Sequence, residues 1–114
     1  MATYAIGIDI GGTNTKFGIV DQHGHIVQQD RLLTNGPEGV QDFIEELHRK
    51  LAPLIENHGG NKNFTGIGIG APNGNFYSGT IEYAPNLKWK GIIPLAKMFT
   101  EKFGLEAKLT NDAN

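Results

Sequence analysis

The sequence predicts an α/β domain built on a mixed five-stranded sheet. Short apolar segments rich in β-branched residues recur along the chain and predict strands. Two longer segments repeat their apolar residues at helical spacing, and glycine or proline bounds most elements. The resulting order is βββαβαβ, which is typical of an α/β domain. The 114 residues, 39% hydrophobic and 19% charged, suit one globular domain.

Three strands are expected at the start of the chain. Residues 4–10 form a largely apolar run that ends at two adjacent glycines, where the backbone can turn without steric cost. Residues 16–20 and 26–33 are two further extended segments, and segment 21–24 between them carries good turn residues. These short connections predict an antiparallel meander.

A helix and a fourth strand follow. From Val40 the apolar residues recur at intervals of three and four, which predicts a helix closed by Gly59 and Gly60. Pro53 lies inside this helix and should bend or weaken it, because proline lacks the N–H donor. Residues 65–71 alternate glycine with larger residues, which predicts a strand that another backbone or a ligand approaches closely.

The last third of the chain contains one helix and one strand. Residues 72–90 show no clear periodicity, so a loop with at most one short hairpin is expected there. Residues 94–103 regain helical spacing, with proline at the start and Gly104 at the end. Residues 105–109 alternate apolar and polar side chains, which predicts a half-buried strand that leads to Asn111.

The composition argues against nucleic-acid and membrane partners. The net charge is −2, the isoelectric point is about 6.0, and no block of lysine or arginine provides a footprint for a phosphate backbone. The sequence contains no basic segment followed by a long apolar run. It therefore predicts neither a signal peptide nor a membrane span. The absence of cysteine fits a reducing compartment. We therefore expect a cytoplasmic protein.

Polar and glycine-rich segments follow three of the predicted strands. These segments are Asp9 with residues 11–13, then residues 72–74, and finally residues 111–112. Ligands of open α/β sheets bind outside the carboxyl ends of parallel strands. If the first, fourth and fifth strands run parallel, the three segments meet in one cleft.

The first segment has the parts of a phosphate-binding hairpin. Gly11 and Gly12 allow backbone amides to approach phosphate oxygens without an intervening side chain. Asp9 could then hold Mg²⁺ through water, because this ion keeps most of its hydration shell. Thr13 stands where a P-loop requires lysine, which excludes that motif. The alternative is a glycine-rich β-hairpin with a structural aspartate.

The other two segments carry candidate sugar ligands and a candidate base. The carboxylate of Asp112 could accept a proton from an attacking alcohol, and Asn111 could hydrogen-bond substrate hydroxyls. Residues 72–74 could present backbone and amide groups to a polyol. Taken alone, each segment favours a structural role, as a turn or a helix cap.

The same residues resemble the motifs of the ROK family of sugar kinases. Residues 8–16 (IDIGGTNTK) resemble the family's phosphate-one signature. Residues 68–74, residues 83–87 with Trp89, and residues 111–114 resemble three further segments of that family, in the expected order. Four ordered motifs that span the chain identify it as similar to ROK proteins.

The resemblance implies a two-lobed fold of the ribonuclease H and actin type, with sugar and ATP bound between the lobes. The 114 residues would form the N-terminal lobe, the C-terminal lobe would be absent, and this lobe alone should be inactive. The implied activity is ATP- and Mg²⁺-dependent phosphorylation of a hexose, with glucose at its 6-hydroxyl as the favoured acceptor. Any structural zinc site would belong to the C-terminal lobe, and a homodimer of the full-length protein is left open.

The resemblance also assigns roles to individual residues. The family most often has Gly-x-Pro-Gly where residues 71–74 place an additional asparagine before the glycine, which puts the contacts of that loop in doubt. Asp112 would be the base. The sugar would be bound by Asn111, Asn73, Gly74 and Asn86. The phosphates and Mg²⁺ would be faced by Asp9, Gly11, Gly12 and Thr13.

Two other functions share part of this pattern. A sugar-sensing regulator of the ROK family carries a helix-turn-helix ahead of the sugar lobe, and the strand expected from Tyr4 leaves no room for one. An actin-like ATPase module would keep the glycine hairpin but lack a sugar site. Sugar binding by Asn111 and Asp112 would separate the kinase from that module.

Overall fold

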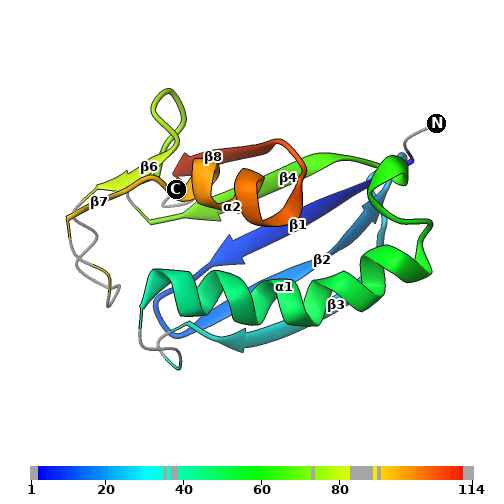
Figure 1. Ribbon diagram of the computed structural model, residues 1–114, viewed down its shortest axis with the longest axis horizontal. Coiled ribbons are helices and arrows are strands. Elements are labelled where there is room, and N and C mark those ends of the chain that lie inside the picture. The colour runs from blue at the N-terminus through cyan, green and yellow to red at the C-terminus, as the bar shows by residue number, and fades with distance from the viewer. Residues whose placement is uncertain are drawn as a thin grey trace.

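Five strands form a mixed sheet that is covered on one face by two helices (Figure 1). The computed structural model describes residues 3–34, 36, 39–72, 74–82, 89 and 91–111. β1, β4 and β8 are parallel to one another, and β2 is antiparallel to both of its neighbours. In the order β3-β2-β1-β4-β8, the sheet contains β1 (Tyr4–Ile10), β2 (Asn14–Asp21), β3 (Ile26–Leu33), β4 (Phe64–Ala71) and β8 (Ala107–Asn111). The predicted fold class is confirmed.

The two helices connect the parallel strands. α1 (Val40–Asn57) lies in the connection from β1 to β4, and α2 (Leu95–Phe103) lies in the connection from β4 to β8. Both connections step in the same direction across the sheet, and crossovers of this kind are right-handed. The helices therefore lie on the same face (Figure 1).

The ends of the helices agree closely with the predicted ones. α1 begins at Val40 and continues through the exposed Pro53, and α2 ends where Gly104 adopts a φ of 71°. A left-handed residue at this position is a common helix stop, and glycine adopts it without strain. Within the described residues, neither helix combines the length and the apolar character that a bilayer crossing requires.

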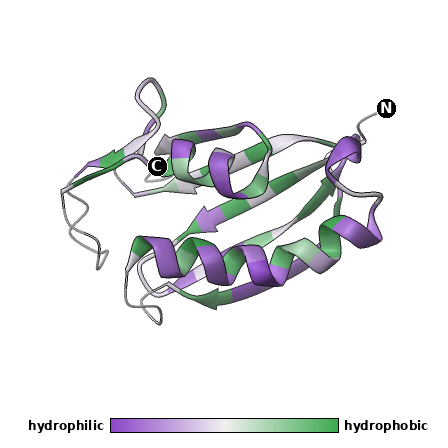
Figure 2. Cartoon of the chain, in the orientation of Figure 1, coloured by the Kyte–Doolittle hydropathy of each residue, from purple (hydrophilic) through white to green (hydrophobic). Residues whose placement is uncertain are grey.

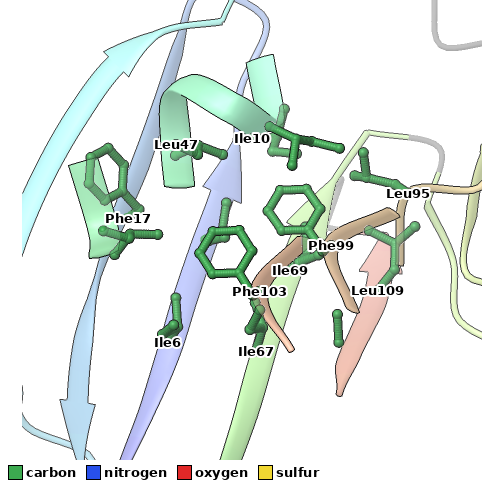
Figure 3. Packing of buried hydrophobic residues seen from close by; sticks show 14 of the residues in the cluster. Ile6, Ile10, Phe17, Leu47, Ile67, Ile69, Leu95, Phe99, Phe103 and Leu109 are labelled. Carbon is green, nitrogen blue, oxygen red and sulfur yellow. The ribbon is translucent and has the colours of Figure 1, made fainter. Parts of the chain in front are cut away.

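The core lies between the helices and one face of the sheet. In β1 the isoleucines alternate with residues that face away from the helices, as the pleat of a strand dictates. Both helices turn mainly hydrophilic residues away from the sheet (Figure 2). Figure 3 shows the buried side chains that meet in this layer, among them Ile6, Ile10, Phe17, Leu47, Ile67, Ile69, Leu95, Phe99, Phe103 and Leu109.

Two predicted strands are shifted. β2 begins at Asn14 rather than at residue 16, because it also pairs with the end of β3 through Leu33. The last strand covers Ala107–Asn111 rather than residues 105–109, because its pairing with β4 begins opposite Ile67. Asn111 is therefore the last residue of β8 instead of following the strand.

A second, small sheet extends from the end of β4. It contains β5 (Gly74–Asn75), β6 (Thr80–Glu82) and β7 (Ile92–Ile93). β5 and β6 form the short hairpin allowed for residues 72–90, whereas β7 has no predicted counterpart. Two isoleucines are too short a run to signal a strand, and β7 forms by pairing with β6, whose Ile81 is buried.

The contact between α1 and the sheet leads to a stability prediction. Leu47 is fully buried, so Leu47→Ala should leave a cavity and lower the free energy of unfolding by about 2–5 kcal/mol. Leu33 on β3 is 61% exposed, and Leu33→Ala should change it by less than about 0.5 kcal/mol. Urea unfolding of the two variants measures the difference, and equal losses would contradict this packing.

Candidate functional site

The carboxyl ends of β1, β4 and β8 lie at one edge of the sheet. Asp9 pairs with Gly70, and Gly70 pairs with Thr110. Ala71 pairs with Asn111 one residue further on. Neighbouring strands are about 4.8 Å apart, so the backbones of β1 and β8 are separated by about 10 Å at this edge. The predicted convergence of the three segments is therefore present in the fold.

Asp9 presents an exposed carboxylate beside this edge. Its neighbours Ile8 and Ile10 point into the core, so its own side chain points to the face away from the helices. It lies opposite Lys16 in the register and lines a groove of about 390 Å³ together with Gly70. Among the described residues, no hydrogen bond or ion pair to the Asp9 carboxylate is present.

This environment suits a hydrated magnesium ion better than a closed metal cage. The described residues contain no group of three or more histidine, cysteine, aspartate or glutamate side chains that could enclose a metal. Mg²⁺ commonly uses one or two carboxylates together with water and substrate phosphates. A single exposed carboxylate such as Asp9 fits that mode.

The turn after β1 is formed by Gly11, Gly12 and Thr13. The Gly11 N–H donates to the carbonyl of Asn14 at 2.9 Å, which closes the turn. A Cβ atom on Gly11 would lie 2.8 Å from the Asn14 oxygen, and the φ of Gly11 lies outside the left-handed region. Glycine is therefore required here by close approach of the backbone rather than by an unusual dihedral angle.

Two buried threonines form hydrogen bonds that stabilise this turn. Thr34, the residue after β3, donates its hydroxyl to the Gly11 carbonyl at 2.7 Å and its N–H to the Thr13 carbonyl at 2.9 Å. The hydroxyls of Thr15 and Thr34 lie 2.7 Å apart. The sequence alone does not predict a role for either residue, because nothing in the local pattern relates two threonines 19 positions apart.

Gly74 lies against the end of β8. A Cβ atom built on Gly74 would be 2.6 Å from the Thr110 carbonyl oxygen and 3.2 Å from that of Ala71. Both contacts are with backbone atoms, which cannot move aside as a flexible side chain can. This glycine therefore lets the segment after β4 pass close to the strand that ends at Asn111.

The remaining predicted residues are placed only in part. The backbone of Asn111 ends β8 at the shared edge. Asn73, Asn86 and Asp112 lie outside the described residues. The described part of the predicted site therefore comprises Asp9, the turn 11–13, Gly74 and the backbone of Asn111, and all of these belong to segments at or next to the carboxyl ends of β1, β4 and β8.

Three aromatic residues that the structure describes in segment 72–90 differ in their surroundings. Trp89 is buried and packs against Phe43 of α1, with the ring centroids 4.7 Å apart. Phe76 and Tyr77 are exposed between β5 and β6 and contact each other edge to face. Trp89 is thus part of the core.

The shifted pKa values belong to groups away from this edge. In the turn between β2 and β3, the N–H of His25 lowers the pKa of the Asp21 carboxyl. The N–H groups of His23 and His25 both donate to Asp21 at 2.9 Å, so this segment is a turn closed by its aspartate. On α1, burial lowers the pKa of His48.

The sheet order and the glycine turn after β1 define a lobe of the actin-like ATPase class. The comparison with known families agrees, because the model of the ROK family matches residues 5–114. The chain belongs to the ROK family.

Relatives of the chain include both kinases and regulators. A glucokinase of Streptomyces coelicolor is 33% identical over 111 residues, which cover 96% of this chain and 32% of the relative. A xylose repressor of Caldicellulosiruptor bescii is 41% identical over 115 residues, which cover 96% of this chain and 28% of the relative.

A solved structure shares the fold of the lobe. The crystal structure of a ROK family glucokinase from Streptomyces griseus, in complex with glucose and AMPPNP, superposes with a TM-score of 0.79 and 30% identity. The match covers 97% of this chain and 34% of that protein. The chain therefore spans about a third of the length of the relatives that it matches.

The close approach of Gly74 to β8 can be tested by adding one methyl group. Gly74→Ala should lower the free energy of unfolding by about 1–3 kcal/mol, because the backbone of β8 must shift. At Gly36 the nearest atom to a new Cβ would be 3.5 Å away, so Gly36→Ala should be neutral or slightly stabilising. Thermal unfolding measures both, and an unaffected Gly74→Ala variant would argue against the contact.

Proposed function

We propose that the protein to which this chain belongs is an ATP-dependent hexose kinase that phosphorylates glucose at its 6-hydroxyl. In this proposal the chain is the N-terminal lobe, and the active site lies between it and a second lobe. The observation that carries the proposal is the shared edge of β1, β4 and β8. It brings the glycine turn and Asp9 to the strand end that Asp112 follows.

The turn after β1 would contact the phosphates of ATP. Gly11, Gly12 and Thr13 lie in a surface turn, where backbone amides can approach an anion. Asp9 would hold the Mg²⁺ ion through water, and the ion would supply neutralisation of the phosphate charge. The exposed carboxylate of Asp9 supports this role.

The segments after β4 and β8 would bind the sugar. Asp112 would accept the proton of the 6-hydroxyl as that oxygen attacks phosphorus, and Asn111 would hydrogen-bond a sugar hydroxyl. Asn73, Gly74 and Asn86 would border the same sugar. In-line phosphoryl transfer depends mainly on positioning and charge neutralisation, so the base contributes only part of the acceleration.

The similarity to glucokinases supports the choice of substrate. The Streptomyces griseus relative was crystallised with glucose and AMPPNP, and this chain shares the fold of its matching third. That complex holds glucose and an analogue of ATP, which correspond to the two substrates that the proposal requires. A cytoplasmic location fits both of these substrates.

A sugar-sensing regulator is the second candidate function. The observation in its favour is the 41% identity to the xylose repressor of Caldicellulosiruptor bescii. Such a protein would bind sugar at the same edge without transferring phosphate. Turnover with ATP therefore separates the two functions.

The role of Asp112 predicts a loss of turnover without a loss of sugar binding. In the full-length protein, Asp112→Asn should lower kcat by about 10²–10⁴-fold, because the hydroxyl proton loses its acceptor. Asp42→Asn, an exposed position in the first turn of α1, should retain full activity. ADP release is measured with a panel of hexoses, and sugar affinity by calorimetry. A wild-type protein that binds a hexose but releases no ADP would favour the regulator.

The role of Asp9 predicts a changed response to magnesium. Asp9→Asn should lower kcat/KM for ATP by about tenfold or more and raise the Mg²⁺ concentration needed for half-maximal rate. Asp30→Asn serves as the control, because the exposed Asp30 carboxylate lies on β3 and accepts a hydrogen bond from the N–H of Arg31. Initial rates over a range of Mg²⁺ at fixed ATP give the comparison. An unchanged Mg²⁺ requirement would leave Asp9 with a structural role.

A further inference from the structure

Two threonine side chains are completely buried beneath the glycine turn. Thr15 and Thr34 are both 0% exposed, and they are the polar residues that the described part of the chain buries. A buried hydroxyl without a hydrogen bond is costly, so each must be satisfied within the protein. Their partners are each other and the carbonyl of Gly11.

The direction of these hydrogen bonds follows from counting protons. The Gly11 carbonyl can only accept, so the single hydroxyl proton of Thr34 is donated to it. In the contact between the two threonines, Thr34 must then be the acceptor and Thr15 the donor. The result is a directed chain from Thr15 through Thr34 to Gly11.

Thr34 contacts the turn on both sides of Gly12. Its hydroxyl binds the carbonyl of Gly11, and its N–H binds the carbonyl of Thr13. The backbone bond of Thr34 would remain with any side chain, but the hydroxyl bond depends on the residue type. The hydroxyl therefore constrains the orientation of the peptide between Gly11 and Gly12.

The orientation of this peptide determines where its N–H points. In a trans peptide the C=O and the N–H of the following residue point in opposite directions. Because Thr34 holds the Gly11 carbonyl toward the buried threonine pair, the N–H of Gly12 is directed away from that pair. In the proposed function, a phosphate contact by the turn would depend on this orientation.

We propose that Thr34 is the positioning residue of the phosphate-binding turn, and that its hydroxyl sets the Gly11–Gly12 peptide for nucleotide binding. The proposal rests on the proposed function, because it assumes that the turn contacts ATP. It adds a residue that does not touch the nucleotide and acts through Gly11. The sugar site, which follows β4 and β8, should not depend on this hydroxyl.

Three variants of the full-length protein separate positioning from stability. Thr34→Val removes the hydroxyl but keeps the shape of the side chain, whereas Thr34→Ser keeps the hydroxyl. Thr15→Val removes the bond between the threonines but leaves the bond from Thr34 to Gly11 in place. Thr15→Val is therefore the matched control for the loss of one buried hydroxyl.

The kinetic readout is the KM for ATP compared with the KM for the sugar. Thr34→Val should raise the KM for ATP about tenfold, equivalent to ~1.4 kcal/mol, and leave the KM for the sugar within about twofold. Thr34→Ser should remain close to wild type. Thr15→Val should lower the melting temperature but raise the KM for ATP by less than about threefold. Equal increases for Thr34→Val and Thr15→Val, or no rescue by serine, would overturn the proposal.

Amide hydrogen exchange of the turn without ligand provides a readout that does not require activity. Thr34→Val should speed exchange at Gly11 and Gly12, and Thr34→Ser should not, because only valine releases the Gly11 carbonyl. Unchanged exchange in Thr34→Val would overturn the anchoring role even if the kinase is active. A wild-type protein that neither binds AMPPNP nor releases ADP would instead overturn the proposed function, and exchange would still decide whether Thr34 anchors the turn.

Discussion

The parallel pairing of β1 with β4, and of β4 with β8, is the constraint on which the rest of the structure depends. It aligns Asp9 with Gly70 and Thr110, although these residues are separated by up to about a hundred positions in the chain. Parallel neighbours require long crossovers, and α1 and α2 lie in them. Because both crossovers step the same way, both helices cover the same face and the carboxyl ends of all three strands meet at one edge.

The pleat of the strands lets the same short segments serve the core and the site. Along β1, isoleucines at every second position pack beneath the helices, while Asp9 points to the opposite face. The chain turns at Gly11 as soon as the core positions end. The backbone of the turn is then held by Thr34 from the neighbouring strand connection. Hydrogen bonds from the sheet thus hold the turn in place, which suits a site whose chemistry depends on positioning.

Much of the fold could be predicted because its signals are local. The apolar run in residues 4–10 and the helical spacing from Val40 identified β1 and α1 with their observed starting points. The start of β8 was placed two residues early, since the pairing with β4 and not the alternation determines where the strand begins. β7 could not be predicted, because its two residues form a strand only by pairing with β6.

By itself the sequence determined the element types, the glycine turn, the candidate residues and the resemblance to the ROK family, since these are carried by local periodicity and by ordered motifs. Only the tertiary structure decided the strand register, the passage of Gly74 against Thr110, and the anchoring of Gly11 by Thr34. These contacts join residues far apart in the chain, and each exists only once the strands have paired. A threonine 23 positions from the glycine that it holds leaves no periodic signal in the sequence.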